Sequence, residues 1–290
     1  MRPAGVPDLS NRICLVAGAS RGVGRGIARA LGEAGATVIV TGRSSESGPR
    51  TEGRPEVLED AAREVDLAGG RGFHYLCDHT REQAVDGLVH WALRRFGRLD
   101  LAVSSVWGGH EGFDGERFPD GAAWGDPFWR RAATPLGHAL RSGPYAGLLL
   151  ARAVAPAMVS AKTGLVVFVS FGTEDGYLGD LFYDLAMAAT NRLALATGAE
   201  LAPRGVTALA LAPGPVRTER ALSAGTDPTG AESPLYAGRA VAALAGDPAV
   251  AAQAGRTLHV ADLARTYGFT DEDGSQPQRF RLGGGAADGD

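Results

Sequence analysis

Short apolar segments alternate along the chain with longer segments in which apolar residues recur every three or four positions. The short segments, rich in Val, Leu, Ile and Ala, predict buried strands at 13–18, 37–42, 72–78, 99–105, 164–170, 206–214 and 256–261. The longer segments predict helices that end at Gly or Pro, at 24–35, 57–70, 81–97 and 184–203. This alternation is typical of a parallel sheet covered on both faces. We therefore expect one doubly wound α/β domain over residues 1–268, with about seven strands.

Two segments interrupt this alternation. Residues 107–131 are crowded with Gly, Trp and Phe, and residues 217–235 form a second irregular stretch. Both follow the carboxyl ends of predicted strands, where open α/β sheets bind ligands, so both are candidate substrate lids. Ordinary surface loops are the alternative. Residues 269–290 are expected to form a partly disordered tail, because the chain ends in "GGGAADGD".

Composition and charge narrow the class of protein. The 290 residues are 44% hydrophobic and 21% charged, with a net charge of −4, which gives no reason to expect nucleic acid or an acidic membrane as a partner. No apolar stretch approaches the roughly 20 residues of a membrane span, and "MRPAGVPDLSNR" has no signal-peptide core. Cys14 and Cys77 lie in apolar runs, which favours reduced core thiols over a disulfide. We expect a soluble cytoplasmic protein.

Histidine spacing gives no sign of a metal site. No paired metal-ligand spacing is found among His74, His79, His90, His138 and His259, so no metal is predicted.

The first chemical motif is "AGASRGVG", residues 17–24. Its glycines follow a predicted strand and open a helix, so the backbone can turn sharply and bring the helix N-terminus against a pyrophosphate. This context predicts a Rossmann-type dinucleotide site. Its binding residues are expected to be Gly18, Ser20, Arg21, Gly22, Val23 and Gly24.

The second strand indicates which dinucleotide binds. It ends at Gly42, where an NAD enzyme places an acidic residue, and Arg43 and Ser44 follow. Because guanidinium groups match phosphate oxygens, Arg43 and Arg21 favour a 2′-phosphate. NADP(H) is therefore the predicted cofactor.

With these motifs, the chain resembles a short-chain dehydrogenase/reductase over about residues 9–265. Ser170 precedes Tyr183 by thirteen residues, the usual family spacing, and "APGPVRT" (212–218) resembles the family's Pro-Gly motif. "VWGGHE" and "ADLARTYGFTDEDG" resemble a subgroup related to the animal dehydrogenase/reductase member 1 proteins. The resemblance implies that Ser170 orients a carbonyl, that Tyr183 is the acid, and that Asp78 touches adenine. It also implies nucleotide contacts at His79, Ser104, Met187, Pro213, Gly214, Val216 and Thr218.

The predicted active site departs from the family pattern at several positions. The lysine that normally lies four residues after the tyrosine, and lowers its pKa, is replaced by Met187. Lys162 is the only lysine in the chain. Ser104, Ser105, Val106 and Trp107 stand where the family has Asn-Asn-Ala-Gly, Gly143 aligns with a helix asparagine, and Ala17 replaces a threonine.

Three functions remain open from the sequence. The first is an NADPH-linked carbonyl reductase, because reduction needs Tyr183 only as a neutral acid. The second is a non-redox step such as dehydration, cyclisation or isomerisation, with His110, Glu111, Glu174 or Asp175 assisting Tyr183. The third is a non-catalytic NADPH-binding protein. We favour the reductase because the nucleotide motif and the Ser170–Tyr183 pair are retained.

The aromatic 107–131 segment indicates a bulky apolar or aromatic small-molecule substrate. Substrate contacts are expected at Trp107, His110, Phe171 and Tyr177. The apolar helices at 145–159 and 185–201 match those through which the family pairs, so a homodimer or homotetramer is expected.

Overall fold

The computed structural model describes residues 5–174, 176–225 and 228–281. Within these residues, seven strands form one parallel sheet in the order β3-β2-β1-β4-β5-β6-β7. The strands are β1 (Ile13–Ala17), β2 (Thr37–Gly42), β3 (Arg71–Leu76), β4 (Leu101–Ser104), β5 (Leu165–Val169), β6 (Thr207–Ala212) and β7 (Thr257–His259). The predicted doubly wound, Rossmann-type domain is confirmed, although most strands are shorter than predicted.

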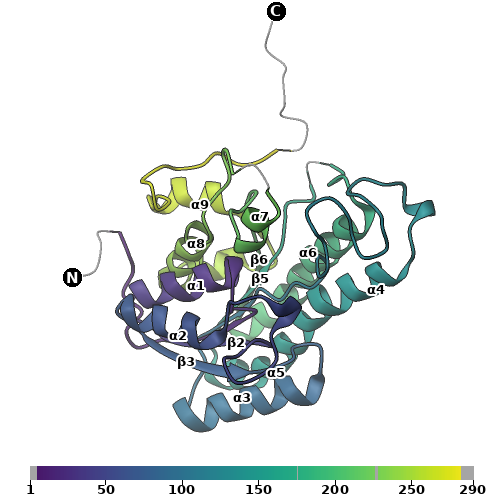
Figure 1. Ribbon diagram of the computed structural model, residues 1–290. Helices are drawn as coiled ribbons and strands as arrows, with labels where there is room; N and C mark the ends of the chain where they lie inside the picture. Colours follow the sequence, from purple (N-terminus) through teal and green to yellow (C-terminus); the bar gives the residue numbers. More distant parts are fainter. Residues whose placement is uncertain (1–4, 175, 226–227, 282–290) are drawn as a thin grey trace, which may run out of the picture.

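Helices cover both faces of the sheet (Figure 1). One face carries α1 (Gly22–Glu33), α2 (Leu58–Leu67), α8 (Pro234–Gly246) and α9 (Val260–Tyr267). The other carries α3 (Glu82–Phe96), α5 (Ala146–Ala161) and α6 (Leu181–Leu201). Because successive strand residues point to opposite faces, Val16 belongs to the first core and Leu15 to the second. Strands buried on both faces explain the nearly continuous apolar runs in the sequence.

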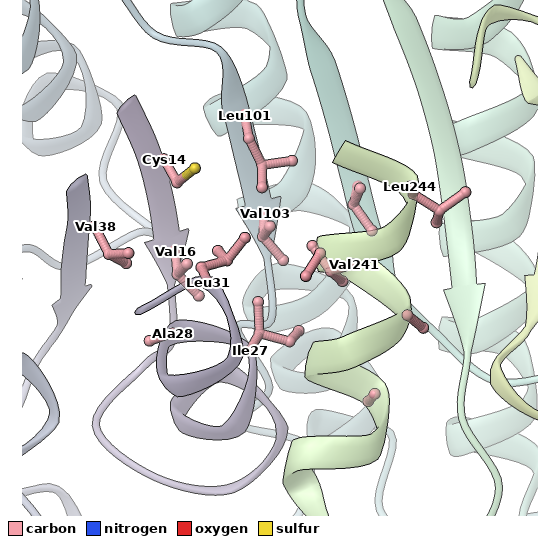
Figure 2. Packing of buried hydrophobic residues seen from close by; sticks show 14 of the residues in the cluster. Cys14, Val16, Ile27, Ala28, Leu31, Val38, Leu101, Val103, Val241 and Leu244 are labelled. Carbon is pink, nitrogen blue, oxygen red and sulfur yellow. The ribbon is translucent and has the colours of Figure 1, made fainter. Parts of the chain in front are cut away.

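The first core shows how closely helices and sheet approach. Figure 2 shows Ile27 and Leu31 of α1 and Val241 of α8 gathered near Val103 of β4 in this core. A Cβ atom added at Gly26 of α1 would lie 2.2 Å from the backbone of Pro234 in α8. Glycine therefore permits a contact between α1 and α8 that any other residue would obstruct, and this contact fixes the helix that opens at the glycine-rich loop.

The segment before α5 is helical but irregular. Helix α4 (Thr134–Leu140) continues through a π-helical turn (Arg141–Tyr145) into α5. By length and composition alone, the run Thr134–Ala161 is long and apolar enough to cross a membrane. Leu150 and Val154 are nevertheless buried in the second core, as expected of a core helix.

The smaller elements are short turns at the surface. They are helix α7 (Glu219–Ser223) and 3-10 turns at Thr51–Gly53, Phe128–Arg130, Ala202–Arg204 and Val250–Gln253.

Both cysteines are free and buried, which confirms the prediction of core thiols. Desolvation, followed by the charge of Asp78, raises the pKa of the Cys77 thiol to about 12, so this thiol stays neutral and unreactive.

The described segment after α9 packs against the domain at Asp271 and Phe280. Asp271 is buried and accepts a hydrogen bond from the backbone N–H of Ser233 at 2.8 Å. Phe280 packs edge-on against Phe171, with ring centroids 5.8 Å apart. The predicted disorder of "GGGAADGD" falls on residues 283–290, which lie outside the described residues.

Candidate active site

A cleft of about 400 Å³ opens at the carboxyl ends of the central strands. It runs from the glycine-rich loop between β1 and α1 to the start of α6, and it is bordered by the segments that follow β4, β5 and β6. This is where open α/β sheets bind ligands.

The glycine-rich loop is shaped for close approach of a ligand. Gly18 has φ +77°, and a Cβ atom there would lie 2.4 Å from the carbonyl oxygen of Ser105. Gly22 has φ +59° and begins α1, so its N–H group is one of the free donors at the helix N-terminus. That N–H donates to Glu219 Oε2 at 2.7 Å. A carboxylate of the protein therefore occupies the anion position of the helix.

Arginines at this end of the cleft are also paired with carboxylates of the chain. Arg21 lies 3.2 Å from Glu52, Arg43 pairs with Glu111, and Arg220 pairs with Glu52.

Arg21 is enclosed by carboxylates on both sides of its guanidinium. Its Nη1 is buried and makes no hydrogen bond among the described residues, but it lies 3.7 Å from Glu56 Oε2. Burial, and next the nearby charge of Arg220, lower the pKa of Arg21. Arg21 and Arg43 line the cleft beside the glycine-rich loop, where guanidinium groups can pair with the phosphates of a dinucleotide.

Asp78 and His79 follow β3 at the same end. Desolvation opposes ionisation of Asp78, but hydrogen bonds from the Thr80 N–H (3.0 Å) and hydroxyl (2.7 Å) hold its pKa below the usual value. The ring of His79 is buried with Nε2 2.7 Å from Thr41 Oγ1. Burial lowers the pKa of His79 to about 4, so this ring is neutral and braces β2.

Tyr183 is held in place by Asp180, the residue that caps the N-terminus of its helix. Asp180 caps α6 by accepting hydrogen bonds from the N–H groups of Phe182 (3.0 Å) and Tyr183 (2.9 Å). Its second carboxylate oxygen pairs with Arg131, and both side chains of this pair are 3% exposed. The Arg131 guanidinium also lies between the rings of Phe118 (4.5 Å) and Phe182 (4.7 Å). The 107–131 segment is thus fastened directly to the helix that carries Tyr183.

Met187 lies beside the predicted catalytic pair, as the helical spacing predicts. It is 6% exposed, and its sulfur is 3.8 Å from Ser170 Oγ. Ser170 Oγ donates to the Met187 carbonyl oxygen at 3.2 Å. Burial raises the pKa of the Tyr183 phenol well above its ordinary value, and no charged group among the described residues offsets this effect. At neutral pH, Tyr183 is a proton donor and not a phenolate.

The departures at Trp107 and Gly143 are physically connected. A Cβ atom added at Gly143 would lie 3.2 Å from the indole of Trp107. Gly143 lies in the π-helical turn, where Ser142 Oγ accepts a hydrogen bond from the Gly108 N–H at 3.0 Å. The indole therefore fills the space that an asparagine side chain at 143 would need.

Aromatic rings surround Tyr183 on several sides. Its ring centroid lies 5.5 Å from those of Trp107 and His110, 5.4 Å from Trp124 and 6.1 Å from Phe171. The His110 ring is nearly parallel to that of Tyr183, with an interplanar angle of 22°. Burial, and then the charge of Arg220, lower the pKa of His110 to about 4, so this imidazole is neutral as well.

Most of the predicted site residues line this one cleft. They are Gly18, Ser20, Arg21, Gly22, Val23, Arg43, Asp78, His79, Ser104, Trp107, His110, Phe171, Ser170, Tyr183, Met187, Pro213, Gly214, Val216 and Thr218.

Three predicted site residues do not line the cleft. Gly24 packs against the backbone of Gly18, where a Cβ atom would lie 2.2 Å from the Gly18 carbonyl oxygen. Ser44 is buried and accepts a hydrogen bond from the Thr51 N–H at 3.1 Å, so it holds the following turn. Tyr177 is 58% exposed and lies outside the cleft.

The candidate acids and bases do not all lie in the cleft. Glu111 lines the cleft, whereas Glu174 pairs with His259 and Arg279 instead. Asp175 lies outside the described residues.

Several residues of the site were not anticipated from the sequence. Arg131, Asp180, Glu219 and Arg220 have no role in the sequence motifs. Asn191 donates to the Phe171 carbonyl oxygen at 2.9 Å and so fixes the loop after β5. Only Asp180 had a readable signal, because an Asp directly before an apolar helical run is a typical N-cap.

Similarity to known proteins was found along most of the chain. The family model described as short chain dehydrogenase matches residues 12–121 and 145–228. Dehydrogenase/reductase SDR family member 1 of Mus musculus is 33% identical over 93% of this chain and 86% of its own length. The Homo sapiens protein of the same name is 31% identical over 94% and 87%.

Solved structures share the fold. A metagenomic short-chain oxidoreductase in complex with NADP is 28% identical, covers 82% of this chain and 92% of its own, and has a TM-score of 0.63. A putative dehydrogenase from Xanthomonas campestris has a TM-score of 0.74 at 23% identity, and the match covers 94% of both chains.

Proposed function

This chain belongs to the short chain dehydrogenase family, and on that premise we propose that it is an NADP(H)-dependent carbonyl reductase for a bulky aromatic or apolar small molecule. The observation that carries the proposal is that Ser170 and Tyr183 line one cleft with the glycine-rich loop, Arg21 and Arg43, so that one end can hold a phosphorylated dinucleotide and the other a carbonyl substrate.

The cofactor preference rests on the second strand and on one relative. Arg21 and Arg43 line the cleft where an acidic residue would select NAD, and the metagenomic relative was solved with NADP. When bound, the nicotinamide supplies a hydride. The glycine-rich loop, Asp78 and Thr218 would hold the nucleotide.

The protein groups supply the proton and the orientation. Ser170 releases the Met187 carbonyl and donates its hydroxyl hydrogen to the substrate carbonyl oxygen. Tyr183 donates its phenolic proton to the same oxygen, which completes the alcohol and leaves a phenolate that takes a proton from water. Reduction begins from the neutral phenol, which burial makes the resting form of Tyr183, whereas alcohol oxidation must begin from the phenolate.

The test measures consumption of NADPH and NADH with a panel of aromatic ketones and quinones, for the natural protein beside Met187→Lys. We expect the natural protein to reduce part of the panel with a preference for NADPH. We expect Met187→Lys to accelerate alcohol oxidation more than reduction, because an ammonium there lowers the Tyr183 pKa. Turnover by the variant alone would indicate that the natural protein catalyses a non-redox step. NADPH binding without turnover by either protein would indicate a non-catalytic nucleotide-binding role.

Two further properties belong to this proposal. Leu148 of α5 and Leu185 and Leu195 of α6 are exposed large apolar residues on the helices expected to pair, which supports a homodimer or homotetramer. The two buried free thiols support a reducing, cytoplasmic setting. Light scattering and fractionation test these two properties.

A further inference from the structure

We propose that Trp107 and His110 form a second hydrogen-bonding subsite, which binds an oxygen atom of an aromatic substrate other than the carbonyl that reacts. The proposal rests on the reductase function and narrows its substrate to flat aromatic ketones that carry an additional hydroxyl or carbonyl group.

Three residues that line the cleft carry a buried ring nitrogen without a hydrogen-bond partner among the described residues: His79 (Nδ1), Trp107 (Nε1) and His110 (Nε2), and the last two are adjacent. Trp107 Nε1 and His110 Nε2 are both buried, and neither has a hydrogen-bond partner among the described residues. Both residues line the cleft, and their rings meet edge to face with centroids 5.4 Å apart. Because a buried polar group without a partner loses its hydration and gains nothing in return, such groups are rare away from functional sites. Two adjacent ones in one cleft indicate a polar atom of the ligand.

The chemistry of the two rings selects the kind of atom. An indole nitrogen is only a donor, so the ligand atom near Trp107 must be an acceptor. Neutral imidazole carries one proton, so His110 Nε2 can donate to a carbonyl oxygen or accept from a hydroxyl. A phenol, which both donates and accepts, and a second carbonyl, which accepts, both satisfy this pair.

The subsite is held in place by its backbone. A Cβ atom at Gly109 would lie 2.4 Å from the Trp107 indole, and one at Gly143 would lie 3.2 Å from it, so two glycines confine the ring. The carbonyl oxygen of His110 accepts a hydrogen bond from Arg220 Nη1 at 2.5 Å. This fixed position argues for recognition of a defined ligand atom and not for a side chain that turns to find water.

The aromatic rings around the subsite favour a substrate with a flat ring system. Tyr183 and His110 lie nearly parallel, and Trp107 and Trp124 stand beside them. A flat ring next to these faces gains stacking contacts that an aliphatic ketone does not. The bicyclic ketone 1-tetralone and its 5-, 6-, 7- and 8-hydroxy derivatives are therefore suitable probes, because they differ only in one phenolic oxygen.

The experiment measures both the dissociation constant and kcat/KM for 1-tetralone and each hydroxytetralone. We expect at least one hydroxytetralone to bind about three- to tenfold more tightly than 1-tetralone, the range of one hydrogen bond. Trp107→Phe keeps an aromatic ring and removes the N–H, so the ratio of the dissociation constants of 1-tetralone and the preferred hydroxytetralone, both measured on the variant, should fall to about one. Trp129→Phe is the matched control, because Trp129 is 72% exposed on the same segment and outside the cleft, and it should retain the preference.

His110→Phe gives a second test if Trp107→Phe fails to fold, since it removes the other nitrogen and keeps a flat ring. No preference among the isomers in the natural protein, no binding of any of them, or a preference that survives both variants would overturn the subsite. A preference in the dissociation constants without any NADPH turnover would retain the subsite and refute the reductase. Reduction of 1-tetralone without a preference for any hydroxy derivative would support the reductase and refute the subsite.

Discussion

The two ends of the cleft satisfy their polar groups in opposite ways. At the nucleotide end, Arg21, Arg43 and Arg220 are paired with the protein's own carboxylates, and Glu219 caps the Gly22 N–H. At the Tyr183 end, aromatic rings replace charges, and two ring nitrogens have no partner among the described residues. A phosphate must therefore displace carboxylates to bind at the nucleotide end. At the Tyr183 end, a ligand oxygen can bind the two ring nitrogens without displacing a protein group among the described residues.

This difference changes the free energy that a ligand gains by binding at each end. Exchange of one partly buried anion for another has a small net free energy, because desolvation and pairing nearly cancel on both sides. Filling an apolar, rigid site gains the full contact without displacing an ion pair. The nucleotide end should accordingly determine salt dependence, and the Tyr183 end should determine substrate selectivity.

The largest expected effect is on the Tyr183 phenol. Tyr183→Phe removes the proton donor and keeps the ring in its aromatic surroundings, so carbonyl reduction should fall by about 10²–10⁴-fold. NADPH affinity should change much less than turnover, because most of the predicted nucleotide contacts lie at the glycine-rich end of the cleft. Steady-state kinetics and nucleotide titration measure the two quantities separately. Undiminished turnover would remove Tyr183 from the chemistry.

The second effect concerns the buried ion pair between Arg131 and Asp180 at the aromatic end. Arg131→Met leaves Asp180 buried without its cation, and it should lower the free energy of unfolding by about 3–5 kcal/mol. Chemical denaturation measures this change, with Arg130→Met on the exposed neighbouring position as the matched control. Because Asp180 also caps the helix of Tyr183, kcat should fall with stability in Arg131→Met. Equal stability of the two variants would show that the 107–131 segment is not fastened through this pair.

The sequence could predict the nucleotide end better than the aromatic end, for a physical reason. Gly18, Gly22 and Arg43 act through a loop and a strand end that are local in sequence, so their spacing carries their geometry. Arg131 and Asp180 are 49 residues apart, and their contact depends on the path of an irregular segment that no periodicity describes.

The placements that failed show a related limit. Ser44 follows the cleft residue Arg43, but a hydrogen bond to the Thr51 turn holds it outside the cleft. Tyr177 lies midway between the cleft residues Phe171 and Tyr183 in sequence, but its side chain is exposed to solvent. Met187 was placed correctly beside Tyr183 because helical spacing alone fixes it. The fit of Trp107 against Gly143 required the structure, since two departures from a family pattern do not reveal that they share one space.

A third effect tests whether the nucleotide end is occupied by its own carboxylates. Glu219→Gln removes the negative charge that sits on the Gly22 N–H, so NADPH should bind about three- to tenfold more tightly. Fluorescence titration at low salt measures the change, and Glu116→Gln, exposed on the 107–131 segment, is the control. Weaker binding by the variant would mean that Glu219 helps to hold the nucleotide and does not compete with it.

The smallest effect concerns a feature that the two ends share, a buried neutral histidine. Burial lowers the pKa of both His79 and His110 from 6.5 to about 4, so neither ring should gain a proton between about pH 8 and about pH 6. Their C2 proton resonances should stay constant over this range. Because the folded-state pKa is the lower one, the stability from each neutral ring is fully present above pH 6.5. It is lost as pH falls from there towards 4. His110→Phe should therefore weaken the decrease of Tm with acid without changing Tm at neutral pH by as much. If the His110 resonance instead titrates near pH 6.5, the ring is open to water, and the difference between a charged end and a dry aromatic end of the cleft does not hold.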